Sequence, residues 1–574
     1  MVTEKEVVME KEVVAEEGPE MVQNAVGNLV EKPQYGGVLN TADAVGPRWG
    51  FSNSSRLRGY PFWWWRMTNE NLAEPDGSGE YEGISGEFAS YDIMTGNLAE
   101  SWEVIEPDTL IFHIRQGVRW HDKPPTNGME LTSDDVVYTF VLTWGREGAM
   151  APRTYPLLSN LKNPEESIYV HPDDPWAVVF KSVPGKLPAL WEFVSNLNYI
   201  VPEALGPMEE EGFVDWWGVV GTGPIILTDY VSGSSLTWER NTNYWKNDPL
   251  HPENQLPYLD GLKTFIMADL STQQAALRTG KLDILTKVEV EDAESISRSS
   301  PELQWRRSWG TWYGLYMRND VAPFDDVNVR RAMMMAIDHE EITQAYYGGE
   351  AEKFWWPAYP IPEHASMYVP LEEMPEAVQE LYGCHPDKAE QLLDAAGLPG
   401  PNRFTTSVIA NLEEDIDLLS VVKEYWSRVG VTLEIRVKET AVQRSMATAK
   451  TYEHGYIASV SVGGQINKMQ HTVPGGLSNY AMVDDPLVEK WVADISKLYF
   501  DPAAKARFVK EASPELINRA YHIRLPAPIT YNAWQPWLGG YHGETSPSYM
   551  AGVTKASEYV WIDQDLKEEM TGKR

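Results

Sequence analysis

The sequence predicts an α/β protein with mixed β-sheets and more than one domain. In the C-terminal half, apolar stretches with strand periodicity alternate with helical stretches that end at a glycine, which is typical of this architecture. The chain has 574 residues, of which 43% are hydrophobic. This length exceeds what one hydrophobic core usually serves, so we expect about two to four domains, each with a sizeable core.

The composition argues against several classes of protein. The chain has 48 basic and 84 acidic side chains and a formal net charge of −36, which argues against charge-driven binding to nucleic acid or to an anionic membrane. No uninterrupted apolar run reaches the roughly 20 residues of a membrane-spanning helix. The single cysteine, Cys384, excludes a disulfide within the chain and a zinc site built from cysteines.

The first segment, residues 1–32, differs from the rest of the chain. The sequence Glu4-Lys-Glu-Val-Val8 recurs as Glu10-Lys-Glu-Val-Val14, and the segment has no aromatic residue. We therefore expect an acidic, low-complexity tether. The segment does not have the basic start, apolar stretch and cleavage site of a secretion signal, and an acidic tail of a cytosolic protein is the alternative interpretation.

The central stretch, residues 219–284, predicts a compact series of elements. Gly221-Thr-Gly-Pro224 should form a turn, because glycine allows positive φ and proline fixes its own φ. The apolar patterns then predict strands at 225–230, 235–240 and 258–268, the first two joined as a hairpin, and a helix at 271–279 that ends at Gly280.

Helix-start signals mark further elements. Thr132 with Asp135 three residues on can form a capping box, and Asp326 and Asp338 can each cap the helix that follows. Periodicity completes the predicted order: strands at 110–115, 404–409, 431–437 and 456–462, and helices at 389–396, 418–429, from 441, and at 501–517.

The central stretch also carries a series of short motifs in a fixed order, namely Gly221-Thr-Gly-Pro224, Glu239-Arg-Asn241, Tyr244-Trp245, Pro257-Tyr-Leu-Asp260, and Ala275-Ala-Leu277 followed by Gly280 and Asp283-Ile284. In order and spacing they resemble the signature region of the bacterial extracellular solute-binding proteins of family 5. Ile225 and Thr242 depart from the tyrosine and proline usual there. Residues 98–144 and 312–349 resemble further blocks of the same family, and the resemblance covers about residues 35–562.

The resemblance implies a periplasmic-binding-protein-like fold of type II, with two lobes and an extra domain (the cluster C type). It implies that a ligand binds between the lobes and that they close by a hinge motion. The expected boundaries are 33–75, 190–285 and 520–574 for lobe I, 76–189 for the extra domain, and 286–519 for lobe II.

The resemblance also implies a function. We expect an extracytoplasmic solute-binding protein of an ABC importer, which delivers its ligand to a membrane permease without catalysis and without a cofactor. Family members are exported, often as lipoproteins, so we expect the full-length precursor to have a leader and a lipid anchor outside this sequence. We expect a monomer.

The chain has no recognisable catalytic motif. GxxxxGK[ST], HExxH and GxSxG do not occur, and His339-Glu-Glu341 is better interpreted as a helix start than as a zinc motif. A metal pair of His113 and His121 is conceivable, although these positions recur where the family binds no metal. Cys384 has no identifiable base. A hydrolase that has borrowed the fold is therefore a minor alternative.

Aromatic clusters are the better indication of a site. Adjacent side chains of a strand face opposite ways, so Trp63, Trp64 and Trp65 cannot all enter one core. Together with the cluster that includes Trp355 and Trp356, they suit stacking on flat ligands such as the apolar faces of sugar rings. Packing between domains is the alternative interpretation of both clusters.

A departure from the family pattern bears on the ligand. Peptide-binding members hold the peptide's amino terminus with an aspartate shortly after the strand that here ends near Val462, but Gly463-Gly-Gln-Ile-Asn467 contains no acidic residue. A buried ammonium would be left unpaired, at a cost of several kcal/mol. We therefore expect an oligosaccharide-like ligand; an oligopeptide held without that aspartate is the second hypothesis, and a nickel-type chelate or another small molecule is also possible. The predicted ligand-binding residues are Trp49, Trp63, Trp64, Trp65, Trp312, Trp355, Trp356, Tyr359, Gly463, Gly464, Gln465, Asn467 and Trp534.

Overall fold

The computed structural model describes residues 20–47, 51, 67–76, 91–105, 107–145, 156–197, 199–206, 215–353, 357–360, 364–412, 415–460, 473–474, 476, 478–543 and 556–573.

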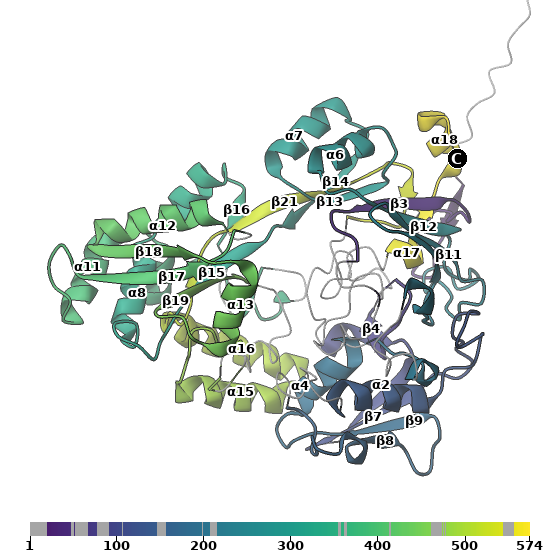
Figure 1. Ribbon diagram of the computed structural model, residues 1–574, viewed down its shortest axis with the longest axis horizontal. Helices are drawn as coiled ribbons and strands as arrows, with labels where there is room; N and C mark the ends of the chain where they lie inside the picture. The colour runs from purple at the N-terminus through teal and green to yellow at the C-terminus, as the bar shows by residue number, and fades with distance from the viewer. Residues whose placement is uncertain are drawn as a thin grey trace, which may run out of the picture.

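Sheet A is a mixed sheet at the right of Figure 1. The β10–β11 hairpin is the predicted one, with Val231 opposite Ser235, and β12 pairs in parallel with β3 near the N-terminus. The predicted third strand, 258–268, is shorter in the structure, Gly261–Ile266. Tyr258, which precedes it, is buried and donates its hydroxyl to Asp248 (2.7 Å). In spatial order, the strands are β10 (Ile225–Val231), β11 (Ser235–Arg240), β12 (Gly261–Ile266) and β3 (Val38–Asp43).

In Figure 1, sheet C lies at the left and sheet B lies beside it at the upper centre. Sheet B is antiparallel, and sheet C is mixed, as predicted for this part of the chain. Sheet B comprises β13 (Ile284–Val288), β21 (Ala527–Trp534) and β14 (Gln304–Trp309), with β16 (Ala351–Glu352) also paired to β21. Sheet C comprises β18 (Val431–Val437), β17 (Phe404–Ala410), β19 (Gly455–Val460), β15 (Trp312–Met317) and β20 (Ile523–Arg524).

Two adjacent short crossings join strands of sheet B directly to strands of sheet C; the described chain also reaches sheet B at β16, which lies between β15 and β17 of sheet C in the sequence. The first crossing joins β14 to β15 through residues 310–311, and the second joins β20 to β21 through residues 525–526. The Gly310 N–H donates to the Pro528 carbonyl (2.9 Å), and the Leu525 N–H donates to the Tyr313 carbonyl (3.3 Å). Each crossing is only two residues long, and backbone hydrogen bonds hold the two crossings beside each other.

Helices cover one face of sheet C. Leu315, Ile457 and Ile523 of the sheet share a buried apolar cluster with the covering helices. The predicted cap is present at α8, where the Asp326 carboxylate accepts from the Asn328 N–H (2.7 Å). The helices on this side of the sheet are α8 (Val327–Met335), α9 (His339–Glu341), α10 (Glu376–Gln379), α11 (Pro386–Ala395) and α12 (Ile416–Arg428). Ala447 of α13 (Thr440–Ala449) instead packs with Ile409 and Ala458 on the other face.

Sheet D is antiparallel and lies at the bottom of Figure 1. The predicted capping box at its main helix is present, because the Asp135 carboxylate accepts from the Thr132 N–H (3.0 Å). Its strands are β6 (Ala99–Ile105), β7 (Thr109–Ile114), β9 (Ala177–Lys181) and β8 (Ile168–Val170), and its helices are α2 (Ser133–Gly145) and α4 (Leu187–Glu192).

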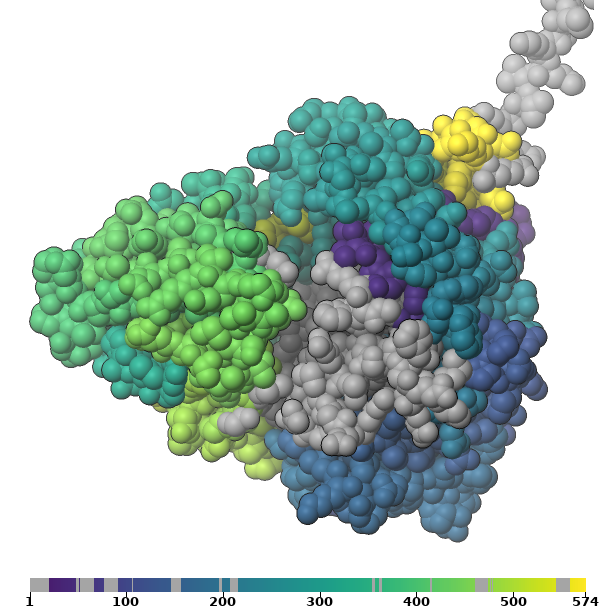
Figure 2. Space-filling model, in the orientation of Figure 1, coloured from purple at the N-terminus to yellow at the C-terminus, as the bar shows by residue number. Residues whose placement is uncertain are grey.

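Two C-terminal helices join the region of sheet C to that of sheet D. Trp491 of α15 (Pro486–Leu498) belongs to the same buried cluster as Trp191 of α4. Lys505 of α16 (Pro502–Asn518) is buried and lies 3.5 Å from the Asp92 carboxylate. In Figure 2 the yellow-green atoms of these helices lie between the green and blue parts of the molecule. The described residues thus connect the regions of sheets C and D through an apolar core in addition to the chain itself.

We use lobe I for sheets A and B, lobe II for sheet C with its helices, and extra domain for sheet D with its helices. Some strands lie across the predicted boundaries: β14 and β16 fall within 286–519 but pair in sheet B, β13 runs past residue 285 into that range, and β20 falls within 520–574 but pairs in sheet C. Strand pairing follows the two crossings, which the sequence pattern did not reveal. The division into domains at those residue numbers stays a prediction.

The end of the predicted tether is folded. Residues 20–32 contain a hairpin whose Ala25 N–H donates to the Leu250 carbonyl (2.8 Å). Residues 1–19 lie outside the described residues, so the tether there stays a prediction. The remaining short pairs and helices are β1 (Met21–Gln23) with β2 (Leu29–Glu31), β4 (Ala73–Pro75) with β5 (Met94–Gly96), β22 (Leu538–Gly539) with β23 (Trp561–Ile562), and α6 (Leu270–Arg278), α7 (Val290–Ser299), α17 (Ala556–Tyr559) and α18 (Gln564–Thr571).

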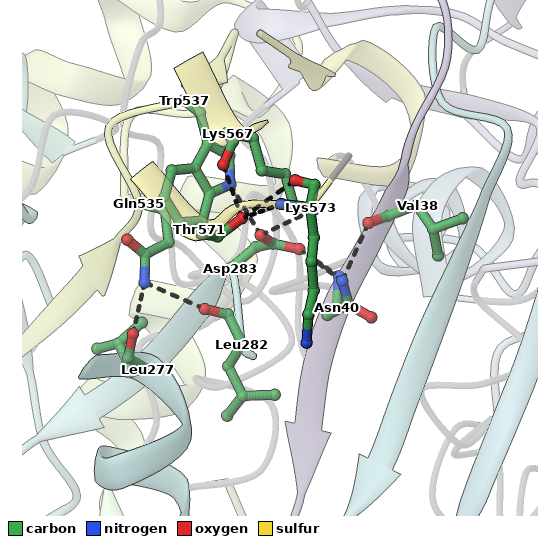
Figure 3. Close-up of polar contacts among 10 residues, drawn as sticks. All are labelled: Val38, Asn40, Leu277, Leu282, Asp283, Gln535, Trp537, Lys567, Thr571 and Lys573. Carbon is green, nitrogen blue, oxygen red and sulfur yellow. Dashed lines mark hydrogen bonds and ion pairs between the residues drawn. The ribbon is translucent and has the colours of Figure 1, made fainter. Parts of the chain in front are cut away.

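A buried carboxylate ties distant segments of lobe I together (Figure 3). Asp283 is fully buried. Its carboxylate accepts from the Asn40 N–H (2.7 Å) and from the Trp537 indole N–H (2.8 Å), and it lies 3.4 Å from Lys567 Nζ. These partners come from β3, from the segment after β21, and from α18. The aspartate of the Asp283-Ile284 motif therefore connects both ends of the chain to the end of the central stretch.

Candidate functional site

Most of the predicted ligand-binding residues cannot be placed. Residues Trp49, Trp63, Trp64, Trp65, Trp355, Trp356, Gly463, Gly464, Gln465 and Asn467 lie outside the described residues. Their role stays a prediction. Trp312, Tyr359 and Trp534 lie among the described residues.

Trp312 and Tyr359 lie together beside the first crossing. Trp312 is the first residue of β15, and its ring centroid is 6.1 Å from that of Tyr359, with the planes inclined at 58°. Tyr359 stacks on His364 at 5.7 Å and donates its backbone N–H to His364 Nδ1 (3.2 Å). Both Trp312 and Tyr359 are buried. Two of the predicted residues therefore form one aromatic pair, at the position where lobe II meets sheet B.

Trp534 lies elsewhere. It is opposite Gln304 at the start of β14, whereas Trp312 follows the other end of that strand. Its ring packs edge-on against Tyr541 at 5.3 Å, within the buried apolar cluster of lobe I. The structure does not bring Trp534 together with Trp312 and Tyr359.

The face of sheet C opposite its apolar core continues the aromatic surface. Alternation along β15 puts Trp312, Gly314 and Tyr316 on one face, while Leu315 enters the core of lobe II. The Tyr316 ring lies 4.9 Å from the His522 ring and 5.7 Å from the Tyr480 ring. This face is therefore lined by aromatic side chains from three separate parts of the chain.

Arg524 lies on the same face and was missed by the sequence analysis. It is directly opposite Gly314, and residues opposite each other on paired strands share a face. Because Gly314 has no side chain, the Arg524 side chain has room on this face. The Arg524 guanidinium carbon is 5.9 Å from the Tyr316 ring centroid. The alternation of Ile523, Arg524 and Leu525, with the two apolar residues in the core, is the sequence signal that could have identified it.

The groups around Arg524 are neutral. Burial, and next the charges of Arg524 and Arg330, hold the pKa of His522 well below its usual value, and its Nδ1 accepts from Arg524 Nη2 (3.2 Å). Burial lowers the pKa of His339 to about 4, and its Nε2–H donates to the Arg524 carbonyl (2.9 Å). Arginine keeps its charge at any ordinary pH. Among the described residues, the side chains that contact the Arg524 guanidinium are therefore uncharged.

Other chemistry suggested by the sequence finds no support in the described residues. His113 lies beside Glu103 (2.9 Å), while His121 is buried and hydrogen-bonded to the backbone of Gly223, so the two histidines belong to different surroundings. No group of three metal-ligating side chains occurs in the described part of the chain. Cys384 is exposed. His339 begins α9, as the sequence predicted.

Two lobes joined by a pair of adjacent crossings, with an extra domain, define a periplasmic-binding-protein-like protein of type II. The sequence profile of the bacterial extracellular solute-binding proteins, family 5, matches residues 94–468 in its middle region. This match spans more than half of the chain, and the chain belongs to that family. The predicted fold and family are both confirmed.

Individual relatives are distant. Heme-binding protein A of Haemophilus influenzae is 25% identical over 468 residues, which cover 77% of this chain and 81% of the relative. A putative ABC transporter peptide-binding protein of Brucella ovis is 26% identical over 498 residues, 82% of each chain. The structure of the oligopeptide-binding protein AppA from Bacillus subtilis, in complex with a nonapeptide, has a TM-score of 0.66 at 18% identity and covers 92% of this chain and 100% of that chain. At this identity the structural likeness shows the fold alone.

Family membership fixes the general function. The chain is the extracytoplasmic solute-binding component of an ABC importer, it works with permease subunits, and it is not an enzyme. Among the described residues, no helix combines the length and apolarity needed to cross a membrane. The oligosaccharide ligand predicted from the sequence is not confirmed.

Proposed function

We propose that this protein captures oligopeptides between its two lobes and delivers them to the importer's permease. The observation that carries the proposal is the aromatic face of sheet C, with Trp312, Tyr316 and Arg524 directly beside the crossings between the lobes. Aromatic rings beside a charged donor suit a chain that has apolar side chains and polar ends. The peptide-binding relative from Brucella and the nonapeptide complex of AppA support the same class of ligand.

Closure in this proposal is a rotation about the crossings. Hinges are short segments that absorb backbone rotation while the flanking elements move as units. The segments 310–311 and 525–526 fit this description, because strands of different sheets begin and end on both sides of them. A ligand that contacts both lobes would then favour the closed arrangement through its differential contacts.

An oligosaccharide is the second candidate. The described observation that favours it is the Trp312–Tyr359 pair, since inclined aromatic rings can stack on the apolar faces of sugars. The Arg524 cation, which makes no ion pair with a described Asp or Glu, argues for a ligand with an anionic group, which a neutral sugar does not supply. Native mass spectrometry of the purified protein, followed by denaturation, distinguishes the two: a ladder of peptide masses supports peptides, and hexose-spaced masses support sugars.

Replacing Trp312 by alanine is expected to weaken peptide binding by about tenfold or more, because a buried aromatic side chain at the centre of a site contributes most of its contact area. Titration of short synthetic peptides, followed by calorimetry, measures this. Trp305→Ala is the matched control: Trp305 lies on β14 and packs against Tyr531 in a different cluster of lobe I. Equal affinities of the Trp312→Ala variant and the wild type would remove Trp312 from the site.

We further propose that the precursor is lipid-anchored and that the protein acts as a monomer. Lipoprotein anchoring is common in the resembled family, and the large acidic excess of the chain favours dispersal in solution. Light scattering of the purified protein checks the second proposal, since a mass of two chains would contradict it.

A further inference from the structure

Arg524 is a buried cation without a carboxylate partner in the described structure. It is 8% exposed, its Nη1 has no hydrogen-bond partner, and it makes no ion pair with a described Asp or Glu. A buried charge that is not compensated costs several kcal/mol. Such a group is rarely kept unless something else pairs with it.

The other buried arginines of lobe II are compensated. Arg403 pairs with Asp394 (2.5 Å). Arg330 donates from Nη1 to the Phe324 carbonyl (2.7 Å) and from Nε to the Arg519 carbonyl (3.2 Å). Arg524 differs from both in its acceptors: Nη2 donates to the neutral ring of His522, the guanidinium also hydrogen-bonds the neutral hydroxyl of Tyr316, and Nη1 has no acceptor among the described residues. Arg330 also makes no ion pair with a described carboxylate, but backbone carbonyls accept from its guanidinium, whereas no described group accepts from Arg524 Nη1.

We propose that Arg524 is the subsite for a carboxylate of the bound solute. This inference rests on the proposed function in one respect: if the ligand is a peptide, the peptide supplies the carboxylate. His522 occupies Nη2, and Nη1 remains to donate to the ligand. A guanidinium presents its donors in a planar fork that matches a carboxylate, and the charge strengthens each hydrogen bond.

The surroundings favour this occupant. The Tyr316 ring lies 5.9 Å from the Arg524 guanidinium carbon, and the low polarity of such aromatic surroundings strengthens an ion pair once water is excluded. Trp312 and Tyr359 lie beside the same group, so the predicted aromatic contacts and the carboxylate subsite belong to one face. The position of Arg524, immediately before the second crossing, puts the charge at the boundary between the lobes.

The test compares matched peptides by calorimetry at neutral pH. The probes are short alanine peptides with a free carboxylate, the same peptides with a C-terminal amide, and amidated peptides with one internal glutamate. The wild type is expected to bind a peptide with a carboxylate about tenfold to one-hundredfold more tightly than the fully amidated peptide. Arg524→Gln should bind all three alike. Arg318→Gln, which removes an arginine paired with Asp320 on the same lobe (2.7 Å), should keep the wild-type preference.

Each outcome decides the proposal. A preference for the free terminal carboxylate, lost in Arg524→Gln, supports a terminal carboxylate at Arg524, and a preference confined to the glutamate peptide supports a side-chain carboxylate there. No preference in the wild type, or a preference that persists in Arg524→Gln, overturns the subsite.

A second measurement separates this inference from the peptide hypothesis. Sodium acetate, compared with sodium chloride at equal ionic strength, should raise the thermal midpoint of the wild type and not that of Arg524→Gln. If no peptide binds but acetate acts in this way, the anion subsite is supported and the peptide function is overturned. If neither peptides nor acetate have an effect, both are overturned. Arg524→Lys keeps the positive charge but not the planar guanidinium, so it should retain part of the acetate effect. This variant is the control in case Arg524→Gln does not fold.

Discussion

Replacing Asp283 by alanine is expected to lower the free energy of unfolding of lobe I by about 3 to 5 kcal/mol. The substitution removes the acceptor for the Trp537 indole N–H and for both nitrogens of Asn40, and it removes the carboxylate next to Lys567. Lys567 is 7% exposed, so its ammonium would remain buried and unpaired. Urea unfolding followed by tryptophan fluorescence measures the loss.

The control for this prediction is a surface ion pair of the same lobe. Glu294→Ala breaks the exposed pair with Arg298 (3.7 Å) on α7 and should cost less than about 1 kcal/mol. The double variant Asp283→Leu with Lys567→Met should be less destabilised than Asp283→Ala, because it leaves no charge uncompensated. A loss below about 1 kcal/mol for Asp283→Ala would contradict the structural role given to the carboxylate.

The network also explains why Asp283 belongs to a recognisable motif. In the sequence, Asp283 is recognisable only as part of a short motif. Its hydrogen-bond partners are distant along the chain: Asn40 lies 243 positions before it and Trp537 lies 254 positions after it. The role of Asp283 therefore required the fold.

Local signals gave most of the secondary structure. The caps by Asp135, Asp326 and Asp501 involve hydrogen bonds to residues two or three positions away, so the sequence alone contains all the participants. The glycine stops at Gly280 and Gly430 are also local, and both residues have positive φ, at 65° and 77°. Strand pairing is not local, which is why the crossings and the positions of β14 and β20 were not predicted.

The candidate site was predicted only in part, for a physical reason. Tryptophan clusters are conspicuous in a sequence, and they directed attention to residues that mostly lie outside the described structure. Arg524 is inconspicuous, because a lone arginine in a short strand is common. Its interest arises from the absence of a partner for Nη1 among the described residues and from its position opposite Gly314. Neither property can be read without the pairing of β15 and β20.

A second buried cluster of lobe I makes stability depend on pH. The Tyr244 hydroxyl lies 2.9 Å from Glu70 Oε1 and 2.6 Å from Glu558 Oε1. One phenol has a single proton, so it cannot donate to both carboxylates. If Glu70 is protonated, its O–H can donate to Tyr244, while its other oxygen accepts from the Trp245 indole N–H (3.1 Å). Burial, and next the neighbouring Glu558 carboxylate, raise the pKa of Glu70 from 4.5 to about 7.

The sign of the pH effect follows from the raised pKa. A carboxyl group whose pKa is higher in the folded state contributes stability that is complete below pH 4.5 and is lost as the pH rises through about 7. The difference between the two pKa values corresponds to about 3 kcal/mol. The free energy of unfolding of the wild type should therefore decrease between pH 5 and pH 8. Over this range the folded protein must either keep Glu70 protonated above the ordinary pKa of a carboxyl group or ionise it next to the Glu558 carboxylate.

Glu70→Gln is expected to remove this dependence. The amide has the shape of the protonated carboxyl group, with an N–H for Tyr244 and an oxygen for Trp245, and it does not ionise. The variant should match the wild type near pH 4.5 and exceed its free energy of unfolding by about 2 to 3 kcal/mol at pH 8. Urea titrations of both proteins across this range measure the difference, and Glu302→Gln at an exposed position controls for the loss of one negative charge. A difference between Glu70→Gln and the wild type that stays constant with pH would show that Glu70 is already ionised in the folded protein, and the proton shared with Tyr244 would then have to be assigned to Glu558.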